Sequence, residues 1–504
     1  MGLVNFNKKL DLALLFSNII LGIYLVFRLI NQAKILKYFP LDTTNDISSH
    51  IAQLFFLKVC GFQNLCSYWY NGHYILKFYP PGWFFFSYPF LLVFKRPEIA
   101  TYFSIFAMLL ISFIAIYKII KLKKKSWLNS ISFFLFLFAT PMSISSFFRL
   151  GRVTEMFGWT VFLILTYIIL KYKDKKFDWW FLWFVPFYAI LLISQPIVAI
   201  PFHFFLLSLF ISKIRIKKDM ALFIFFILLA ILISSFWWYP FVRDLGIESR
   251  TYDFLPEITL RFFDIKGQWA SSTILITILP LLTVILFFLF YYSKNKDKKE
   301  LIFYSPILLI SFLVLTRIVT LIPYINFVYP EPYFIFFLIF SLIFFFNTDF
   351  DNLSNKLKNF LGMAIVLLVI ISTIFSFFAT SYYLNYTDLE KNTLEVLGKA
   401  NGKFMILESP SYTSYSRAYY SYAAIYLNLS TPSGWSTSEL TEEHKNLLKS
   451  AGDEFRNKNC KEFKKTAEKI GLKEVITYNE FCQLKEGCNF NEKASKGNVC
   501  LLEI

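Results

Sequence analysis

Charged residues are scarce in this sequence of 504 residues: only 17% are Asp, Glu, Lys or Arg, whereas 56% are hydrophobic and 63 are Phe. A soluble protein of this length has no place for so much apolar surface, so the composition excludes a soluble globular protein. Apolar runs such as 12–30 and 364–379 approach the roughly 20 residues that cross a bilayer core. The chain is therefore predicted to be an all-α membrane protein that crosses the bilayer many times.

The C-terminal quarter lacks the positive excess of the rest of the chain. Residues 381–504 contain 16 basic and 16 acidic residues, so the net charge of +17 belongs to residues 1–380. It falls there in four short runs, at 121–125, 171–176, 213–218 and 294–299. The positive-inside rule makes such runs cytoplasmic loops, so nucleic acid is not expected as a partner. A basic patch that binds phosphates is the alternative.

About eleven spans are predicted between these runs, with the N-terminus in the cytoplasm. The apolar stretch 83–94 follows Pro80 and Pro81 and is too short to cross, so it is expected to lie in the membrane interface. If the stretch 83–94 is not counted as a span, all four basic runs lie on the cytoplasmic side. The spans are predicted at 10–30, 98–118, 127–146, 157–170, 179–194, 196–212, 220–239, 271–292, 301–316, 331–347 and 360–380.

This topology divides the chain into two predicted domains in the cell membrane. Residues 1–380 form a transmembrane domain whose first outside loop, 31–97, carries juxtamembrane helices. Residues 381–504 form a small extracytoplasmic domain of α/β or α+β type, with strands expected at 404–408, 473–478 and 499–503 and a helical stretch at 438–470. This domain lacks a nucleophile elbow, a P-loop and a metal signature. Asn385 and Asn428 begin possible exported glycosylation sequons.

Cysteine is absent from every predicted span and every cytoplasmic loop. Cys60 and Cys66 lie in the first outside loop, and the C-terminal domain holds the other four, Cys460, Cys482, Cys488 and Cys500. Even numbers in each exported unit favour disulfides formed in an oxidising compartment. Cys60 with Cys66 is the simplest pair, and the other four allow three pairings. Zinc is the alternative, although the spacings are wider than in the usual zinc knuckle.

The first outside loop holds one candidate catalytic segment. A helix is predicted to begin at Asp46, and in it Asp46, His50 and Gln53 form a polar stripe. The opposite face is apolar and is expected to rest on the membrane surface; its members are Ile47, Ile51, Leu54 and Phe55. The simpler interpretation is that Asp46 is only the helix cap and His50 only an interfacial polar residue.

The outside loop at 147–156 holds a second candidate segment, with Arg149, Arg152 and Glu155 within seven residues. Two arginines suit a phosphate ligand, because each guanidinium can donate to two phosphate oxygens, and a nearby carboxylate can take a proton from a hydroxyl. An interfacial Arg/Glu pair is the alternative. Further outside charges could line the same cleft, namely Arg243, Arg250, Glu257, Arg261, Asp264 and Arg317.

Three motifs together resemble the GT-C glycosyltransferase superfamily: D-I-S-S-H at 46–50, Y-P-P-G-W at 79–83 and G-R-V-T-E at 151–155. Within it the chain is most similar to the multispan membrane proteins labelled 6-pyruvoyl-tetrahydropterin synthase-related, a label that implies no pterin chemistry. The resemblance covers roughly residues 1–380 and implies an enzyme that uses a polyprenyl-phosphate-linked sugar at the outer face of the membrane.

The resemblance also implies roles for the candidate residues. Asp46 would be the catalytic base with His50 beside it, and Asp42 could exchange roles with Asp46. Glu155 would act with Arg149 and Arg152 at the donor phosphate or a possible divalent metal ion. Arg261 and Arg317 complete the predicted substrate-binding set as outside charges that could line the same cleft, and not through the resemblance. The adjacent acidic pair of protein mannosyltransferases is absent, and 236–239 lacks the acid of the oligosaccharyltransferase peptide motif, so the acceptor stays open.

Two other classes of function remain open from the sequence. A transporter or flippase for a lipid-linked saccharide needs polar groups or broken helices near the bilayer midplane. The chain offers few, the break at 194–196 and the lone His203 among them. A non-catalytic envelope protein would act through its C-terminal domain instead. The enzyme interpretation requires Asp46 and the segment 149–155 to lie together.

Overall fold

Helices account for most of the chain in the structure, a computed structural model. It describes residues 8–41, 46–122, 124–245, 255–323, 325–350, 355–379, 385–408, 414–435 and 440–504. Asp42 and Arg250, two candidates from the sequence, lie outside these residues.

Each of the eleven predicted spans coincides with a helical segment. The segments are α1 (Lys8–Gln32), α4 (Pro97–Leu122), α5 (Trp127–Phe138) with α6 (Pro141–Ser143) and η2 (Ile144–Arg149), α7 (Val153–Tyr172), η3 (Trp179–Trp183) with α8 (Phe184–Ser194), α9 (Pro196–Lys213), α10 (Lys217–Leu245), α12 (Ala270–Ser293), α13 (Lys298–Leu315), α14 (Pro330–Asn347) and α15 (Asn355–Ala379). Short elements between them are η1 (Ala33–Leu36), α11 (Leu255–Phe263), η4 (Ile318–Leu321) and η5 (Ile325–Phe327).

Fewer than eleven of these segments are long and apolar enough to cross a membrane. Within the described residues eight helices meet that standard, or nine if α5 and the segment after it, bent by 48°, are one span. The bend lies just before Pro141, whose ring cannot continue the helical hydrogen bonding of α5. Two of the eleven segments fall short of this standard. The segment from Trp179 to Ser194 is too short. The helix α13 is too charged, because its first turn carries Lys298, Lys299 and Glu300.

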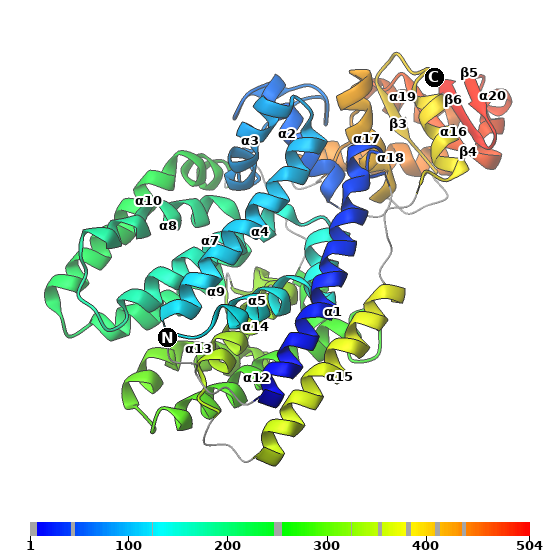
Figure 1. Cartoon of the computed structure of the whole chain (residues 1–504). Helices are drawn as coiled ribbons and strands as arrows, with labels where there is room; N and C mark the ends of the chain where they lie inside the picture. The colour runs from blue at the N-terminus through cyan, green and yellow to red at the C-terminus, as the bar shows by residue number, and fades with distance from the viewer. Residues whose placement is uncertain are drawn as a thin grey trace.

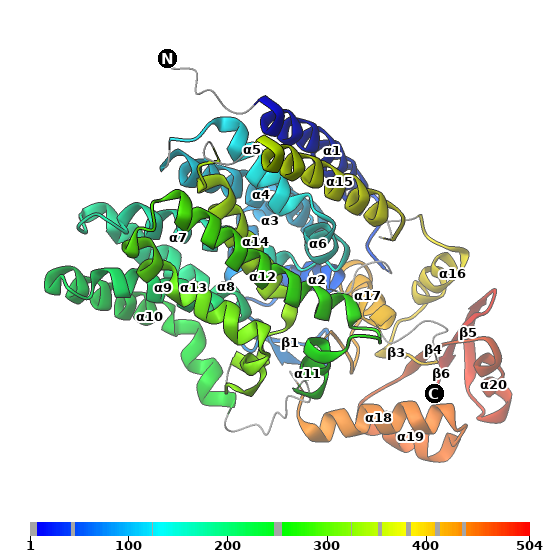
Figure 2. The same cartoon turned by 90° about the horizontal axis from the view of Figure 1, so that it is seen from below.

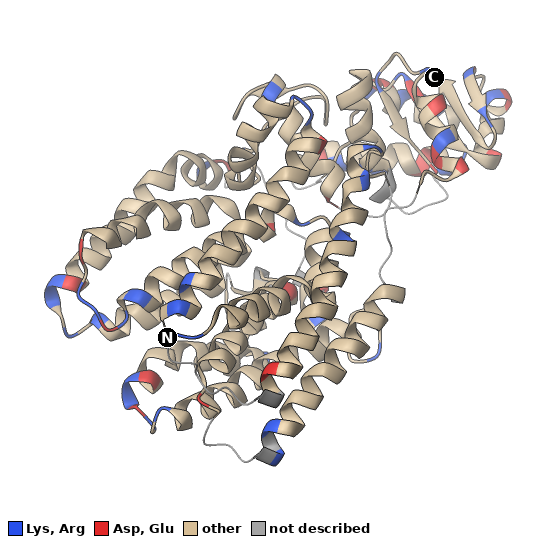
Figure 3. Cartoon of the chain, in the orientation of Figure 1, with Lys and Arg blue, Asp and Glu red and all other residues tan. Residues whose placement is uncertain are grey.

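The arrangement of the helices sets one end of the bundle apart. α1 and α15 run side by side, and α2 (Ile47–Val59) and α3 (Gly82–Phe94) lie at the end that also carries the C-terminal domain (Figures 1 and 2). We call this the domain end. Lys and Arg gather in loops at the opposite end of the bundle (Figure 3). The orientation itself stays a prediction, in which the basic loops are cytoplasmic and the domain end lies outside.

The expectation that α2 rests on the membrane surface is wrong. Ile47, Ile51 and Leu54 are fully buried, and so are the polar residues His50 and Gln53. The reason is that α2 packs against α3, α4 and α17 (Ser414–Tyr422) of the C-terminal domain. The C-terminal domain therefore covers the helix that begins at Asp46.

The C-terminal domain is built on a four-stranded mixed sheet in the order β3-β4-β6-β5. Its elements are α16 (Asp388–Leu397), β3 (Phe404–Ile406), α17 with η6 (Ala423–Leu427), α18 (Glu442–Arg456), α19 (Cys460–Lys469), β4 (Glu474–Tyr478), η8 (Asn479–Gln483), α20 (Leu484–Gly487), β5 (Asn491–Lys496) and β6 (Val499–Glu503). β3 and β4 are parallel, and the other two pairings are antiparallel. The predicted strands are present, and the predicted helical stretch is divided at Lys458, whose φ of 57° is incompatible with a continuing helix.

Alternation along the strands gives the sheet two apolar faces. Phe404 and Ile406 join the core that continues into the transmembrane domain, whereas Met405 belongs to a second core formed with α18 and α19. Successive strand side chains point to opposite faces, so one short strand serves both cores. The C-terminal domain is thus packed onto the bundle through an apolar interface.

All six cysteines are paired. Cys60–Cys66 is paired as predicted and closes a short loop that ends in β1 (Leu65–Cys66), which forms a small hairpin with β2 (His73–Tyr74). In the C-terminal domain the pairs are Cys460–Cys488 and Cys482–Cys500, one of the three pairings that the sequence allowed. Zinc ligation by these cysteines is therefore not supported.

Candidate active site

Asp46 lies directly beside the loop that holds the second candidate segment. It occupies the N-cap position of α2, and its backbone N–H donates to the carbonyl oxygen of Leu150 at 3.3 Å. Leu150 stands between Arg149 and Arg152 in the sequence. The structure thus brings together two segments that are about a hundred residues apart, which the enzyme interpretation requires.

Gly151 makes this close approach possible. Its φ is 64°, and a Cβ atom added to it would lie 2.6 Å from Cβ and 2.7 Å from the backbone nitrogen of Ile47. A side chain is strained at such a φ and has no room against the start of α2. The backbone of the second loop therefore packs directly on the first turn of the first-loop helix.

His50 joins the same two loops through a chain of hydrogen bonds. Its Nδ1 lies 3.2 Å from the carbonyl oxygen of Gly151, and its Nε2 lies 3.1 Å from the hydroxyl of Tyr79. That hydroxyl lies 3.0 Å from Thr154 Oγ1. Because a carbonyl only accepts, Nδ1 carries the hydrogen, and Nε2 accepts from Tyr79.

Burial keeps the hydrogen-bonded side chains of His50 and Tyr79 uncharged. It lowers the pKa of His50 to about 4, although the carboxylate of Asp46 opposes the shift. Burial also raises the pKa of the Tyr79 hydroxyl above its ordinary value. At neutral pH His50 is therefore neutral, and its hydrogen bonds connect the two loops.

Arg152 lies among carboxylates. Its guanidinium is 3.8 Å from Glu155, which also accepts a hydrogen bond of 3.2 Å from the indole of Trp159. Burial opposes the charge of Arg152, but the carboxylates of Glu155, Glu331 and Asp46 together raise the pKa of the guanidinium above its ordinary value. Arg152 is therefore permanently charged, and acidic residues from three parts of the chain stabilise that charge.

Glu331, at the start of α14, is a residue of this cluster that the sequence analysis missed. It forms an ion pair of 2.9 Å with Arg261, which also binds Glu257 at 2.7 Å. The rings of Trp269 and Tyr329 flank the Arg261 guanidinium at 3.8 and 4.7 Å. The signal in the sequence was one acid between two prolines, 330–332, at a helix start, which by itself predicts only a helix N-terminus.

Three polar atoms of the cluster are left without a hydrogen bond to the described residues. Oε2 of Glu155, Oε2 of Glu331 and Nε of Arg261 are buried and make no hydrogen bond to the residues that the structure describes. Buried polar groups in folded proteins nearly always have partners, and such exceptions gather at sites that bind a ligand or water. This is the chemical character expected where charged substrate groups are bound.

The two other arginines of the predicted substrate-binding set differ in availability. Arg149 is exposed and forms no ion pair with any residue in the described part of the chain. Arg317, in contrast, donates to the carbonyl oxygens of Phe262 and Val314 at 3.0 and 2.8 Å and to Thr277. These contacts engage its guanidinium in holding helix ends together, and we leave Arg317 out of the site.

Among the described residues the carboxylate of Asp46 has one hydrogen-bond donor, and it comes from the C-terminal domain. The indole Nε1 of Trp435 donates to Oδ1 of Asp46 at 3.2 Å. The Trp435 ring also lies 4.9 Å from the rings of His50 and Tyr79, centre to centre. Oδ2 of Asp46 makes no hydrogen bond to any described residue.

The described residues do not fit a divalent metal site. Among them no group of three or more His, Cys, Asp or Glu side chains is arranged to hold one ion. The carboxylates around Arg152 instead share a guanidinium. We derive no chemistry through a metal ion.

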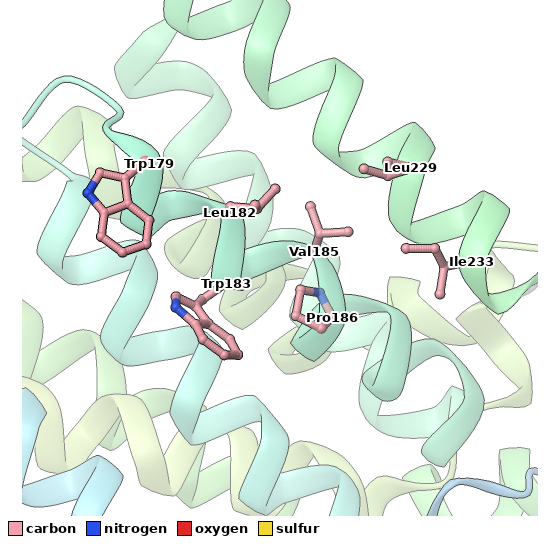
Figure 4. A pocket seen from close by; sticks show the side chains of 7 residues that line it. All are labelled: Trp179, Leu182, Trp183, Val185, Pro186, Leu229 and Ile233. Atoms are coloured by element: carbon pink, nitrogen blue, oxygen red, sulfur yellow. The ribbon is translucent and has the colours of Figure 1, made fainter.

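The other features singled out from the sequence lie apart from this cluster. His203 is satisfied by the Tyr188 hydroxyl at 2.8 Å and the Ala199 carbonyl at 2.6 Å, as in a packed structural histidine. A crevice of about 360 Å³ between the Trp179–Ser194 segment and α10 has no charged residue in its lining (Figure 4). Its lining residues are Trp179, Leu182, Trp183, Val185, Pro186, Leu229 and Ile233. Such a surface suits lipid chains and offers no catalytic group.

Comparison with known proteins gives no sequence family. No protein-family model matches the chain, and no curated protein matches its sequence. Solved structures of oligosaccharyltransferases from Archaeoglobus fulgidus are nevertheless similar to it. One of them is tethered to an acceptor peptide that contains the NVT sequon. It is 11% identical to this chain with a TM-score of 0.56, and the match covers 96% of this chain and 76% of the oligosaccharyltransferase chain.

Two further structures show the same likeness. An oligosaccharyltransferase in complex with Zn and sulfate is 13% identical, with a TM-score of 0.51 over 90% of this chain and 68% of its own. AglB, in complex with an inhibitory peptide and a dolichol-phosphate, is 10% identical, with a TM-score of 0.50 over 92% and 70%. At these identities the likeness concerns the fold, and membership of the 6-pyruvoyl-tetrahydropterin synthase-related group stays a prediction. The chain is a multispan membrane protein with the GT-C fold.

Proposed function

We propose that this protein is an inverting glycosyltransferase that takes its sugar from a polyprenyl-phosphate-linked donor at the outer face of the membrane. The single observation that carries the proposal is the hydrogen bond between Asp46 N–H and the Leu150 carbonyl, because it joins a carboxylate to the arginine-bearing loop. The solved GT-C structures that bind a peptide or a dolichol-phosphate support it as relatives in fold.

Asp46 is the proposed general base. Its free Oδ2 accepts the proton of an acceptor hydroxyl, and the hydroxyl oxygen attacks the anomeric carbon of the sugar. The bond between that carbon and the phosphate oxygen breaks, and polyprenyl phosphate leaves with the bonding electrons. Because the reaction is a single displacement, the configuration of the anomeric carbon is inverted.

Arg149 and Arg152 are the proposed partners of the leaving phosphate. Guanidinium groups match phosphate oxygens with paired N–H donors, and fixed positive charge stabilises the negative charge that develops as the bond breaks. Glu155 holds Arg152 at 3.8 Å and keeps its charge in place. Glu331 and Arg261 extend the polar cluster toward the rest of the bound sugar.

The outer-face orientation is part of the proposal. Three disulfides at the domain end, and basic loops at the opposite end, support it. A lipid-linked donor has its phosphate at the membrane surface and its chain in the bilayer. A cluster of charges at the end of an apolar bundle has the geometry for such a substrate.

The experiment that tests the proposal uses the purified full chain in liposomes with polyprenyl-phosphate-linked hexoses and membrane extracts as the acceptor source. We expect release of free polyprenyl phosphate together with a glycosylated product, both measured by mass spectrometry. Movement of an intact donor across the bilayer without release of phosphate would favour the flippase. Loss of partner binding on removal of 385–504, with no lipid-sugar chemistry in the full chain, would favour the envelope protein.

A further inference from the structure

The segment 428–435 of the C-terminal domain is fastened along the first outside loop. The backbone N–H of Thr431 donates to the Tyr68 carbonyl at 2.9 Å, and the N–H of Tyr70 donates to the Ser433 carbonyl at 3.4 Å. A Cβ added to Gly434 would lie 2.5 Å from the Tyr70 ring, so this ring packs directly on the backbone of Gly434. These contacts deliver the next residue, Trp435, to the start of α2.

Trp435 is held in one orientation there. Its side chain is only 8% exposed and meets the ring of His50 edge-on, at 4.9 Å between centres. The indole has a single polar atom, Nε1, which can only donate. That atom reaches Oδ1 of Asp46 at 3.2 Å, a hydrogen bond to a charged acceptor.

Asp46 stands where its carboxylate would otherwise bond to its own helix. An Asp at an N-cap ordinarily accepts from the backbone N–H two or three residues on, here Ser48 or Ser49. Asp46 makes no such bond. Trp435 supplies the one side-chain donor that the described residues offer this carboxylate, and it leaves Oδ2 open.

We propose that Trp435 is a positioning residue: its indole N–H holds the carboxylate of Asp46 away from the cap of α2 and aims Oδ2 at the acceptor. The proposal rests on the proposed function, in which Asp46 is the base. It makes the C-terminal domain part of the site, because the base is aligned only while this domain is docked.

Other contacts fix the docking independently of Trp435. Tyr426 of the C-terminal domain donates to Glu98 at the start of α4, and Asn71 of the first loop donates to the Ile470 carbonyl at 2.9 Å. Lys403 adds a hydrogen bond of 2.7 Å to Asn71. Removal of one indole N–H therefore leaves the domain in place, which allows the role of Trp435 in alignment to be measured by itself.

The test compares Trp435→Phe with Trp237→Phe in the sugar-transfer assay. Phenylalanine keeps an aromatic ring beside His50 and removes the donor to Asp46. Trp237 is also buried and gives its N–H to the Leu76 carbonyl at 3.0 Å, so its variant loses a comparable hydrogen bond elsewhere. We expect Trp435→Phe to lower kcat by about tenfold to a hundredfold with the donor KM unchanged, and Trp237→Phe to leave kcat unchanged.

A second arm places Trp435→Phe in an Asp46→Asn background, with transfer of radiolabelled sugar followed over long incubations. If Trp435 acts through Asp46, its loss causes no further slowing there. An equal slowing in both backgrounds, or a wild-type rate for Trp435→Phe alone, overturns the positioning role. A faster rate for Trp435→Phe also overturns it, since the indole would then be inhibitory. If Asp46→Asn itself keeps the wild-type rate, the proposed function fails instead.

Discussion

The backbone N–H of Asp46 lies 3.3 Å from the carbonyl oxygen of Leu150, and this contact joins the first outside loop to the loop before α7. Around it lie a carboxylate with an open oxygen, two arginines and a buried neutral histidine. The fold supplies the contact through α2, which is enclosed by α3, α4 and the C-terminal domain.

Gly151 should not tolerate even a methyl group. Gly151→Ala adds a Cβ 2.6 Å from Cβ of Ile47 at a φ of 64°. We expect a loss of about 2 kcal/mol or more of stability, seen as a lower unfolding temperature of the detergent-solubilised protein. Gly452→Ala is the control, because nothing lies within 4 Å of that position. Equal unfolding temperatures for the two variants would contradict the close packing of the loops.

Acidic pH should destabilise the first outside loop. The folded pKa of His50 and of His73 is about 4, below the ordinary value of 6.5. The unfolded chain takes up protons as the pH falls below 6.5, whereas the folded chain does not, so stability is lost between pH 6.5 and 4. Each histidine accounts for about 2 kcal/mol by pH 5.

The measurement is the unfolding temperature at pH 7.5 and at pH 5, followed by tryptophan fluorescence. His50→Gln removes one of the two titrating groups, so the difference between the two pH values should shrink. An unfolding temperature that is the same at both pH values in the wild-type protein would show that these histidines are not buried in their neutral form.

Arg149→Ala should weaken donor binding without affecting the fold. The side chain is exposed and unpaired among the described residues, so its removal costs no buried contact. Loss of one guanidinium at a phosphate should raise the donor KM about tenfold at an unchanged unfolding temperature. Lys461→Ala, an exposed cation on α19, is the control. An unchanged donor KM would remove Arg149 from the phosphate site.

The cysteines give a direct test of orientation. In intact cells a membrane-impermeant reductant followed by an impermeant alkylating reagent should modify the half-buried Cys60, Cys460 and Cys482, whereas Cys66, Cys488 and Cys500 are buried and should stay protected in the folded protein. Without the reductant no labelling is expected, because all six are paired. Labelling only after the cells are opened would put the domain end in the cytoplasm. Loss of the Cys482–Cys500 pair should cost about 2–4 kcal/mol.

The sequence predicted the helices well because the bilayer imposes one simple rule on them. Each of the eleven apolar stretches is helical, since backbone groups in lipid have to be satisfied within the segment. The fate of α2 was predicted wrongly for a related reason. The apolar face of α2 has the same sequence pattern whether it contacts lipid or the C-terminal domain, so the pattern does not predict which of the two covers it.

Local patterns also missed features that depend on tertiary contacts. β5 is polar at every position except Ala494, and it is a strand because β6 pairs with it at the edge of the sheet. Glu331 joins the site only because the fold brings the start of α14 close enough to influence the charge of Arg152. Trp435 reaches Asp46 from 389 residues away. The sequence did identify Asp46, Arg152 and Glu155, because charged residues are rare at the ends of apolar helices and thus conspicuous.

The most direct test of the account is the rate of sugar transfer from a polyprenyl-phosphate donor by Asp46→Asn in liposomes. Asparagine nearly matches the carboxylate in size and cannot take up the acceptor proton. We expect the rate to fall by a factor of about 10² to 10⁴ while donor binding and the unfolding temperature stay as in the wild-type protein. Transfer at the wild-type rate by Asp46→Asn would contradict the assignment of Asp46 as the base.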